Sequence, residues 1–260
     1  PICPYEILGK KYLFNSEGVL IKGTATVNGL TYYTNQEGIL QTGWQTIDGS
    51  KYYFNSNGAM QTGWYTELGK TYYFGNNGIM TTGIANIGTQ SYYFDTTGSL
   101  YKNGFFTVNT KKYYANEKGE LNSSWLSLNG HKYYFGSDFI MDTGWTYLGK
   151  WYFFNAQGQM QTGWLLTGGK WYYLDQSGAM KTGWYLENSK WYYLDKSGAM
   201  LTGWYQDGEK WYYSNTSGVM QTGWITDAAG KEWYLEPNGV WIPVSRELEG
   251  KKIVDRKSVV

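Results

Sequence analysis

Paired tryptophan residues are the feature of this sequence best suited to chemistry. The 260-residue chain holds 14 Trp, and after residue 142 they recur six or seven positions apart. These pairs are Trp145 with Trp151, Trp164 with Trp171, Trp184 with Trp191, and Trp204 with Trp211. Exposing a Trp is costly unless it anchors a ligand or a partner, and the negative face of its ring attracts cations. We therefore expect the pairs to form binding surfaces.

Residues that catalyse reactions or hold metals are scarce. The single His, His131, and the single Cys, Cys3, lie far apart in the sequence and make a poor nucleophile pair. Metal-ligand spacing and a phosphate-binding loop are both absent from the sequence. Asp175 and Asp195 are more simply turn residues that accept hydrogen bonds from nearby backbone amides. We predict a chain that is not an enzyme and has no cofactor, although the intact protein could carry a catalytic domain elsewhere.

Composition restricts the class of protein further. Aromatic residues make up 20% of the chain, which excludes intrinsic disorder. The formal net charge of +1 supplies no field that would hold a nucleic acid. No apolar run reaches the length of about 18 residues that a membrane helix needs. Because the sequence starts with neither Met nor a signal peptide, we interpret it as a fragment or a mature piece of a longer protein.

A repeat of about 20 residues defines the elements that must position the Trp pairs. Glycines mark the repeat at positions Gly18, Gly38, Gly58, Gly78, Gly98, Gly119, Gly158, Gly178, Gly198, Gly218 and Gly239. One more unit fits between Gly119 and Gly158, with Phe139 near the expected glycine position, which gives about twelve units. Each unit has two short aromatic runs separated by turn formers, and this pattern predicts a β-hairpin.

The hairpins predict an all-β, elongated β-hairpin solenoid. An isolated hairpin is marginally stable, but consecutive copies can bury a continuous aromatic core. The glycines would supply positive φ in the loops between hairpins. Propeller blades need about 40 residues and membrane-barrel strands about 9–11, so neither alternative fits the repeat.

The repeated motif of this sequence resembles that of a known family. Residues 161–224 repeat Thr-Gly-Trp, then Lys-Trp-Tyr-Tyr-Leu-Asp, then Ser-Gly-Ala-Met with little deviation. This pattern resembles the choline-binding repeat of Gram-positive cell-wall proteins, and the resemblance extends over roughly residues 9–241. The wider superfamily includes glucan-binding repeats of glucosyltransferases and repeats of clostridial toxins. Membership implies a left-handed superhelix of hairpins, ligands between consecutive units, and a secreted protein on the bacterial cell surface or cell wall.

The resemblance also implies which residues bind choline. Each site resembles a box made from two Trp of one unit and a Tyr and a Met of the next. The implied boxes are Trp145, Trp151, Tyr172 and Met180; Trp164, Trp171, Tyr192 and Met200; Trp184, Trp191, Tyr212 and Met220; and Trp204, Trp211 and Tyr234, with Val240 at the Met position. Rings suit a trimethylammonium group, which has no N–H to donate, at about 0.5–2 kcal/mol per contact. Weak single sites favour a polymer such as teichoic acid carrying phosphocholine.

The N-terminal half departs from this pattern. The second Trp is replaced there by Lys51, Thr71, Ser91, Lys112 and Lys132, and a Lys would repel a cation. Its units are more similar to the toxin and glucan-binding repeats, which implies binding of cell-surface glycans. Candidate surfaces for stacking against sugars are Trp44, Tyr53, Trp64 and Tyr73. The irregular residues 103–138 either bend the solenoid or mark a different site.

The repeat pattern divides the chain into three regions, and three hypotheses about its function remain. Residues 1–141 are the toxin/glucan-binding-like repeats, residues 142–241 the choline-binding-type repeats, and residues 242–260 a non-repeat tail. The leading hypothesis is a non-catalytic cell-wall-attachment module that binds choline or phosphocholine. The alternative is a carbohydrate-binding module that recognises cell-surface glycans. A third hypothesis is a spacer or self-association surface, which would include a homodimer.

Overall fold

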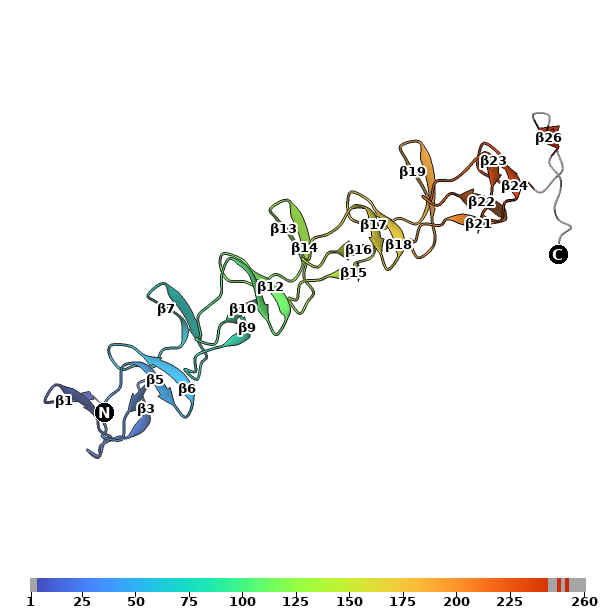
Figure 1. Ribbon diagram of the computed structural model, residues 1–260. Coiled ribbons are helices and arrows are strands. Elements are labelled where there is room, and N and C mark those ends of the chain that lie inside the picture. Colours follow the sequence, from blue (N-terminus) through green and yellow to red (C-terminus); the bar gives the residue numbers. More distant parts are fainter. Residues whose placement is uncertain (1–3, 243–246, 249–250, 253–260) are drawn as a thin grey trace. The chain divides into compact units, whose positions relative to one another are not determined.

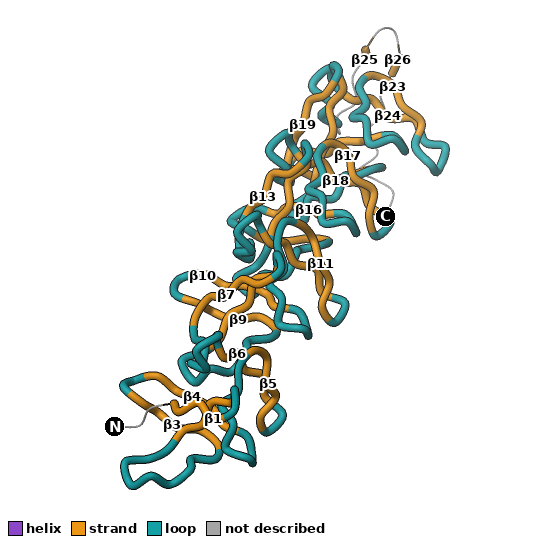
Figure 2. Tube along the Cα trace, turned by 90° about the vertical axis from the view of Figure 1, so that its left-hand side faces the viewer, coloured by secondary structure: helices purple, strands orange, loops and turns teal. Residues whose placement is uncertain are grey.

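The protein is built from β-hairpins. The structure, a computed structural model, describes residues 4–242, 247–248 and 251–252. These residues form strands and turns with no helix, and each strand pairs antiparallel with its neighbour in sequence (Figure 2). The predicted all-β chain of hairpins about 20 residues long is therefore confirmed. Cys3 and most of the tail from residue 243 onward lie outside the described residues.

Two compact units divide the chain. In the described residues, the first unit runs to Trp125 and includes Phe135–Met141, and the second comprises Leu126–Tyr134 and the residues from Asp142 onward. The first unit contains β1 (Pro4–Ile7), β2 (Lys10–Leu13), β3 (Gly23–Val27), β4 (Leu30–Thr34), β5 (Gly43–Ile47), β6 (Ser50–Phe54), β7 (Gly63–Glu67), β8 (Lys70–Phe74), β9 (Gly83–Ile87), β10 (Gln90–Phe94), β11 (Gly104–Val108) and β12 (Lys111–Ala115).

The second unit continues the same pattern. Its strands are β13 (Trp125–Leu128, whose first residue belongs to the first unit), β14 (His131–Tyr134), β15 (Gly144–Tyr147), β16 (Trp151–Phe154), β17 (Gly163–Thr167), β18 (Lys170–Leu174), β19 (Gly183–Glu187), β20 (Lys190–Leu194), β21 (Gly203–Asp207), β22 (Lys210–Ser214), β23 (Gly223–Thr226), β24 (Glu232–Leu235), β25 (Glu247–Leu248) and β26 (Lys251–Lys252). The irregular residues 103–138 thus form ordinary hairpins, and their predicted effect on the solenoid stays a prediction.

Hairpin register decides which rings share a face. In β19–β20, Trp184 lies opposite Tyr193, and Leu186 lies opposite Trp191. Because side chains alternate along a strand, these four side chains point to one face. The turn between the strands is Asn188-Ser189, with φ of 48° and 61°. Two successive positive φ values are typical of the tight type I′ hairpin turn.

Within each unit, backbone hydrogen bonds connect consecutive hairpins. The loop after β20 returns to its own hairpin, where Met200 bridges Leu194. The Met200 amide donates to the Trp171 carbonyl of the preceding hairpin at 2.7 Å. In the first unit, the Met80 amide donates in the same way to the Lys51 carbonyl at 2.8 Å. Hairpins therefore stack in sequence order within each unit, as a β-hairpin solenoid requires (Figure 1).

The repeated glycine is required by both conformation and space. Gly198 has a φ of +85°, as predicted for the loop glycines, and a β-carbon there would overlap the Sδ atom of Met180. The same overlap recurs between Gly218 and Met200. Phe139, predicted near a glycine position, adopts a φ of 65°. Gly198 and Gly218 thus let the Met of the preceding unit pack against bare backbone.

In most hairpins, a buried residue at the end of the second strand forms the core. Phe54, Phe74, Phe94, Phe154, Leu174, Leu194 and Leu235 occupy this position and are fully buried or nearly so. Two hairpins have a polar residue there instead. The Thr34 hydroxyl donates to the Ile21 carbonyl at 2.7 Å, and the Ser214 hydroxyl lies 3.1 Å from the Tyr205 hydroxyl. The core therefore tolerates a small hydroxyl because it is hydrogen-bonded.

The loop acids have the structural role predicted from the sequence. The Oδ1 atom of Asp195 accepts hydrogen bonds from the amides of Ser197 at 2.7 Å and Ala199 at 3.0 Å. Asp175 makes the matching bonds with Ser177 and Ala179. Both carboxylates therefore stabilise a loop.

Candidate functional site

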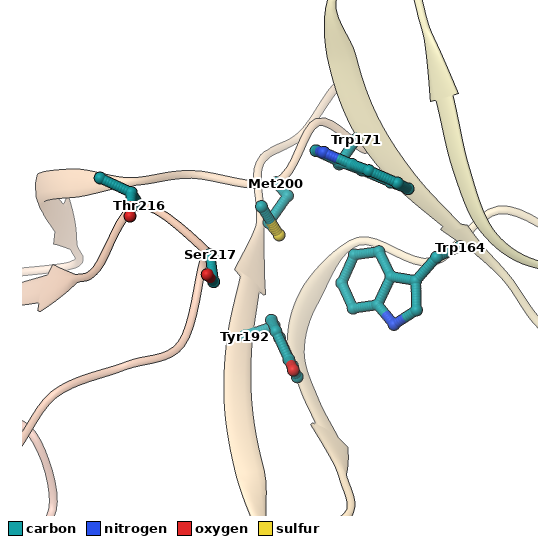
Figure 3. A pocket seen from close by; sticks show the side chains of 6 residues that line it. All are labelled: Trp164, Trp171, Tyr192, Met200, Thr216 and Ser217. Atoms are coloured by element: carbon teal, nitrogen blue, oxygen red, sulfur yellow. The ribbon is translucent and has the colours of Figure 1, made fainter.

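A pocket in the second unit gathers aromatic rings from consecutive hairpins. The Trp164 pocket has a volume of about 410 Å³ and is lined by Trp164, Trp171, Tyr192, Met200, Thr216 and Ser217 (Figure 3). Strands β17 and β18 supply the two Trp, and β20 supplies the Tyr. Met200 follows β20 in the loop, and the two hydroxyl residues come from the loop after β22. Three hairpins together therefore build one pocket.

The rings of this pocket stand roughly perpendicular to one another. The centroids of Trp164 and Trp171 lie 6.5 Å apart with an interplanar angle of 82°. Trp164 and Tyr192 lie 4.8 Å apart at 61°. The rings surround a common open space, with Met200 beside them (Figure 3). Trp171 keeps 43% of its surface exposed, so this wall is open to a ligand.

The Trp184 pocket repeats this arrangement one hairpin later. Its volume is about 420 Å³, and its lining residues are Trp184, Trp191, Tyr212, Met220, Pro237 and Asn238. The two Trp centroids are 6.2 Å apart at 86°, and Trp184 lies 4.7 Å from Tyr212 at 67°. All four residues expected from the sequence therefore line one space.

The ring group around Trp145 has the same geometry. Trp145 lies 6.5 Å from Trp151 at 87° and 4.9 Å from Tyr172 at 65°. The Met180 amide donates to the Trp151 carbonyl at 2.8 Å, as its counterpart Met200 does to Trp171. The structure thus brings together the three predicted rings.

The fourth pocket differs from the sequence prediction. Its volume is about 370 Å³, and it is lined by Trp204, Trp211, Asp227, Ala229, Lys231, Trp233 and Trp241. The predicted Tyr234 is not among these residues, because it lies opposite Trp224 in the β23–β24 ladder, with the two rings 5.4 Å apart.

Strand alternation explains this correction. Neighbouring residues of a strand point to opposite faces, so Trp233 reaches the pocket and Tyr234 turns away. Trp233 lies 5.2 Å from Trp204. Trp241, rather than Val240, takes the place of the methionine, since it bridges Leu235 and its amide donates to the Trp211 carbonyl at 2.8 Å.

The first unit has the same Trp–Tyr pairs without a second Trp. Trp44 lies 4.9 Å from Tyr72 at 66°, and Trp64 lies 5.0 Å from Tyr92 at 75°. Lys51 occupies the register position that a second Trp holds in the second unit. The predicted neighbours Tyr53 and Tyr73 contact Trp44 and Trp64 edge-on within the same hairpins, at 5.3 and 5.1 Å. Applying the count used for the second half would have identified Tyr72 and Tyr92.

Carboxylates at the edges of the Trp walls were missed by the sequence analysis. Trp164 Nε1 donates to Glu187 Oε2 at 2.7 Å, and Trp184 Nε1 donates to Asp207 Oδ2 at 2.9 Å. In the first unit, Trp44 Nε1 donates to a carboxylate oxygen of Glu67 at 2.9 Å. The available signal was an acidic residue 23 positions after each of these Trp.

Metal clusters and membrane-spanning helices are not found among the described residues. No group of three or more His, Cys, Asp or Glu side chains among them could hold a metal ion. No helix in this part of the chain is long and apolar enough to cross a membrane.

Comparisons with known proteins identify relatives of this repeat. A family model described as a choline-binding repeat matches residues 41–82, 146–181 and 167–202. A model described as a putative cell wall binding repeat matches residues 103–121, 123–138 and 202–220. A comparison with curated protein sequences finds no significant match.

Solved structures of streptococcal proteins share the fold. Choline binding protein F from Streptococcus pneumoniae is 30% identical with a TM-score of 0.68, covering 93% of this chain and 98% of that one. CbpJ from the same organism is 28% identical with a TM-score of 0.68, covering 93% and 100%. The S. pneumoniae autolysin LytC, 20% identical over 85% of this chain and 53% of that chain with a TM-score of 0.54, supports the fold alone.

Proposed function

Because this chain belongs to the choline-binding repeat family, we propose that it is a non-catalytic module that attaches to the bacterial cell wall by binding choline. The ligand in the wall would be the phosphocholine of teichoic acids, and the sites would be the aromatic pockets of the second unit. The observation that carries this proposal is the Trp164 pocket, where three rings and a Met surround one space. The Trp184 pocket repeats it.

The pocket chemistry suits a quaternary ammonium. A trimethylammonium group is bulky and cationic and has no N–H, so hydrogen-bond acceptors cannot select it. Ring faces can, at about 0.5–2 kcal/mol per contact depending on desolvation. Three rings then supply roughly 2–5 kcal/mol, which corresponds to a Kd in the millimolar range.

Weak sites in series suit a polymeric ligand. When a second site engages the same polymer, its binding becomes intramolecular, and avidity can rise by about 10²–10⁴. The Trp145, Trp164 and Trp184 ring groups recur at intervals of one hairpin. This spacing would let several phosphocholine groups of one polymer bind the same protein molecule.

Titration with choline, followed by Trp fluorescence, tests the proposal. We expect a saturable change in the millimolar range, and a lack of response at tens of millimolar would contradict choline binding. The control ligand is 3,3-dimethylbutan-1-ol, the neutral analogue with a tert-butyl group in place of trimethylammonium, which should bind more weakly. Trp171→Ala should weaken the Trp164 pocket and leave the far-ultraviolet circular dichroism unchanged.

Glycan binding by the first unit is a second candidate function. Trp44 and Trp64 are exposed, each beside a Tyr of the next hairpin, and the positions of the second wall hold Lys51 and Thr71. Sugars stack on exposed rings while polar neighbours bond their hydroxyls. Binding to a glycan array that persists in excess choline and is lost in Trp44→Ala would support this function. Competition by choline would contradict it.

A further inference from the structure

Two Trp walls of the second unit are each held at the ring edge by a carboxylate of the next hairpin. Glu187 accepts the indole N–H of Trp164 at 2.7 Å, and Asp207 accepts that of Trp184 at 2.9 Å. We call these two pairs the carboxylate clamps. Each acid lies at the end of the first strand of its hairpin, so the clamp joins two consecutive hairpins.

The clamp carboxylates are themselves fixed by tyrosine hydroxyls. The Tyr185 hydroxyl donates to Glu187 Oε1 at 3.2 Å, and the Tyr193 hydroxyl donates to Asp207 Oδ1 at 2.9 Å. Each carboxylate thus uses one oxygen for the indole and the other for a phenol. Burial, and then the hydrogen bond to Asp207, raise the pKa of Tyr193, so its phenol stays protonated as a donor at neutral pH. A carboxylate held by two donors keeps a fixed position at the edge of the ring.

This arrangement has two physical consequences for a ligand in the pocket. First, the hydrogen bond fixes the Trp ring, so less conformational entropy is lost when the ligand binds. Second, a negative charge at the edge of the ring attracts a cation at its face, and the attraction adds to the cation–π contact in a partly desolvated site. Only the first consequence would help a neutral ligand of the same shape.

We propose that Glu187 and Asp207 are positioning and specificity-determining residues, which orient the Trp164 and Trp184 walls and make these pockets prefer a cation over its neutral analogue. This inference rests on the proposed function of the two pockets.

The other ring groups of the second unit provide natural contrasts. Thr167 lies opposite Lys170 in its hairpin, just as Glu187 lies opposite Lys190. The Trp145 group therefore has a Thr at the position of the clamp carboxylate. In the fourth pocket, the acid at this position, Asp227, instead accepts the indole N–H of Trp233 at 2.7 Å, within the same hairpin. The preference for a cation should therefore be weaker at Trp145 than at Trp164 or Trp184.

The test compares two ligands on the full chain. Choline and 3,3-dimethylbutan-1-ol are titrated while the indole N–H resonances are followed by ¹H–¹⁵N NMR, which reads each pocket separately. In Glu187→Gln, choline affinity at the Trp164 pocket should fall about three- to tenfold, while affinity for the neutral alcohol should change less than about twofold. The Trp164 indole resonance of the free protein should also shift, because its acceptor has lost its charge.

Conservative and matched variants separate charge from packing. Glu187→Asp should recover part of the preference for choline, and Asp207→Asn should reproduce the loss at the Trp184 pocket alone. Thr167→Glu should raise the preference of the Trp145 group for choline and shift the Trp145 indole resonance. Because this variant adds a clamp, its effect does not depend on damage to an existing site.

The outcomes distinguish the inference from the function on which it rests. Equal losses for choline and the neutral alcohol in Glu187→Gln, or unchanged affinity for both, would overturn the specificity role while leaving choline binding intact. Failure of the wild-type chain to bind choline would overturn the proposed function and this inference together.

Discussion

The aromatic pockets of the second unit and their counterparts in the first unit differ mainly at one wall. The Trp164–Tyr192 distance of 4.8 Å is close to the Trp44–Tyr72 distance of 4.9 Å. The backbone bonds that join hairpins are also the same in both units. The second wall is Trp171 in one unit and Lys51 at the same register position in the other. The backbone therefore supplies a common frame, and one side chain changes what the frame can bind.

Exchanging the second wall should have the largest effect. Trp171→Lys places the residue type of the first unit in the second, which removes one cation–π wall and adds a like charge. We expect choline affinity at the Trp164 pocket to fall by about 2–3 kcal/mol, or roughly 30- to 150-fold. The Trp184 pocket, monitored by NMR, serves as the control in the same molecule. Retained affinity at the Trp164 pocket would contradict the role of the second wall.

The frame common to both units predicts equal costs for filling the glycine positions. Gly98 packs against Met80 as Gly198 packs against Met180. Substitution of either glycine by Ala should lower the free energy of unfolding by about 2–3 kcal/mol, because positive φ and overlap with the Met side chain add together. Gly183→Ala is the matched control, with a φ of +77° and no atom within 4 Å of its β-carbon, and should cost about 1 kcal/mol. Urea unfolding measures all three, and an equal loss in the control would contradict the packing argument.

The reverse exchange should create a site in the first unit. Lys51→Trp would complete a pocket with Trp44, Tyr72 and Met80, whose backbone arrangement already matches that of the second unit. We expect a new choline site with a gain of about 1–2 kcal/mol from the added ring. Calorimetry should detect one additional site, and the Trp44 indole resonance should shift on binding. Lys51→Leu is the control, since it removes the charge without adding a ring.

The smallest expected effect is on acid stability, where the Asp175 loop of the second unit is compared with the Asn55 loop of the first. Hydrogen bonding by Ser177 leads the interactions that lower the pKa of Asp175 to about 2 from its ordinary value of 3.8, and Lys181 lies 3.1 Å away. A pKa lowered by folding contributes stability above pH 3.8, which is lost as pH falls toward about 2. In the first unit, Asn55 holds the same loop position and accepts the same backbone hydrogen bonds without a charge.

Asp175→Asn should therefore flatten the decrease of stability between about pH 4 and pH 2. Urea unfolding across this range provides the measurement, with Asn55→Ser as a control that should leave the pH dependence unchanged. An unaltered pH profile in Asp175→Asn would show that the charge of this loop contributes nothing to acid stability.

Structural features that depend on spacing within one repeat could be predicted from the sequence. Hairpins, loop glycines and the roles of Asp175 and Asp195 all follow from short-range spacing, and the structure confirms them. The wall pair Trp164 and Trp171 also belongs to a single hairpin and could be identified from spacing alone. Local chemistry in a regular repeat is thus readable from sequence.

Two features could not be predicted from the sequence. One lies in a hairpin that departs from the regular repeat, and the other is a contact between two hairpins. Tyr234 was predicted as a wall from the repeat count, which does not hold in the β23–β24 hairpin. Trp233 lines the pocket there instead. The Trp164–Glu187 hydrogen bond joins residues 23 positions apart in different hairpins, so no motif within one unit contains it. Such contacts depend on how consecutive hairpins stack, and the sequence of a single repeat does not show this stacking.

Whether the second wall decides choline binding can be read from all the pockets in one experiment. Choline is titrated into the ¹⁵N-labelled wild-type chain while all assigned indole N–H resonances are followed together. We expect saturable shifts of Trp164, Trp171, Trp184 and Trp191 at millimolar choline, with Trp44 and Trp64 unchanged. Equal shifts of the indoles in both units would contradict the role of the second wall. Unmoved indoles in the second unit would contradict choline binding itself.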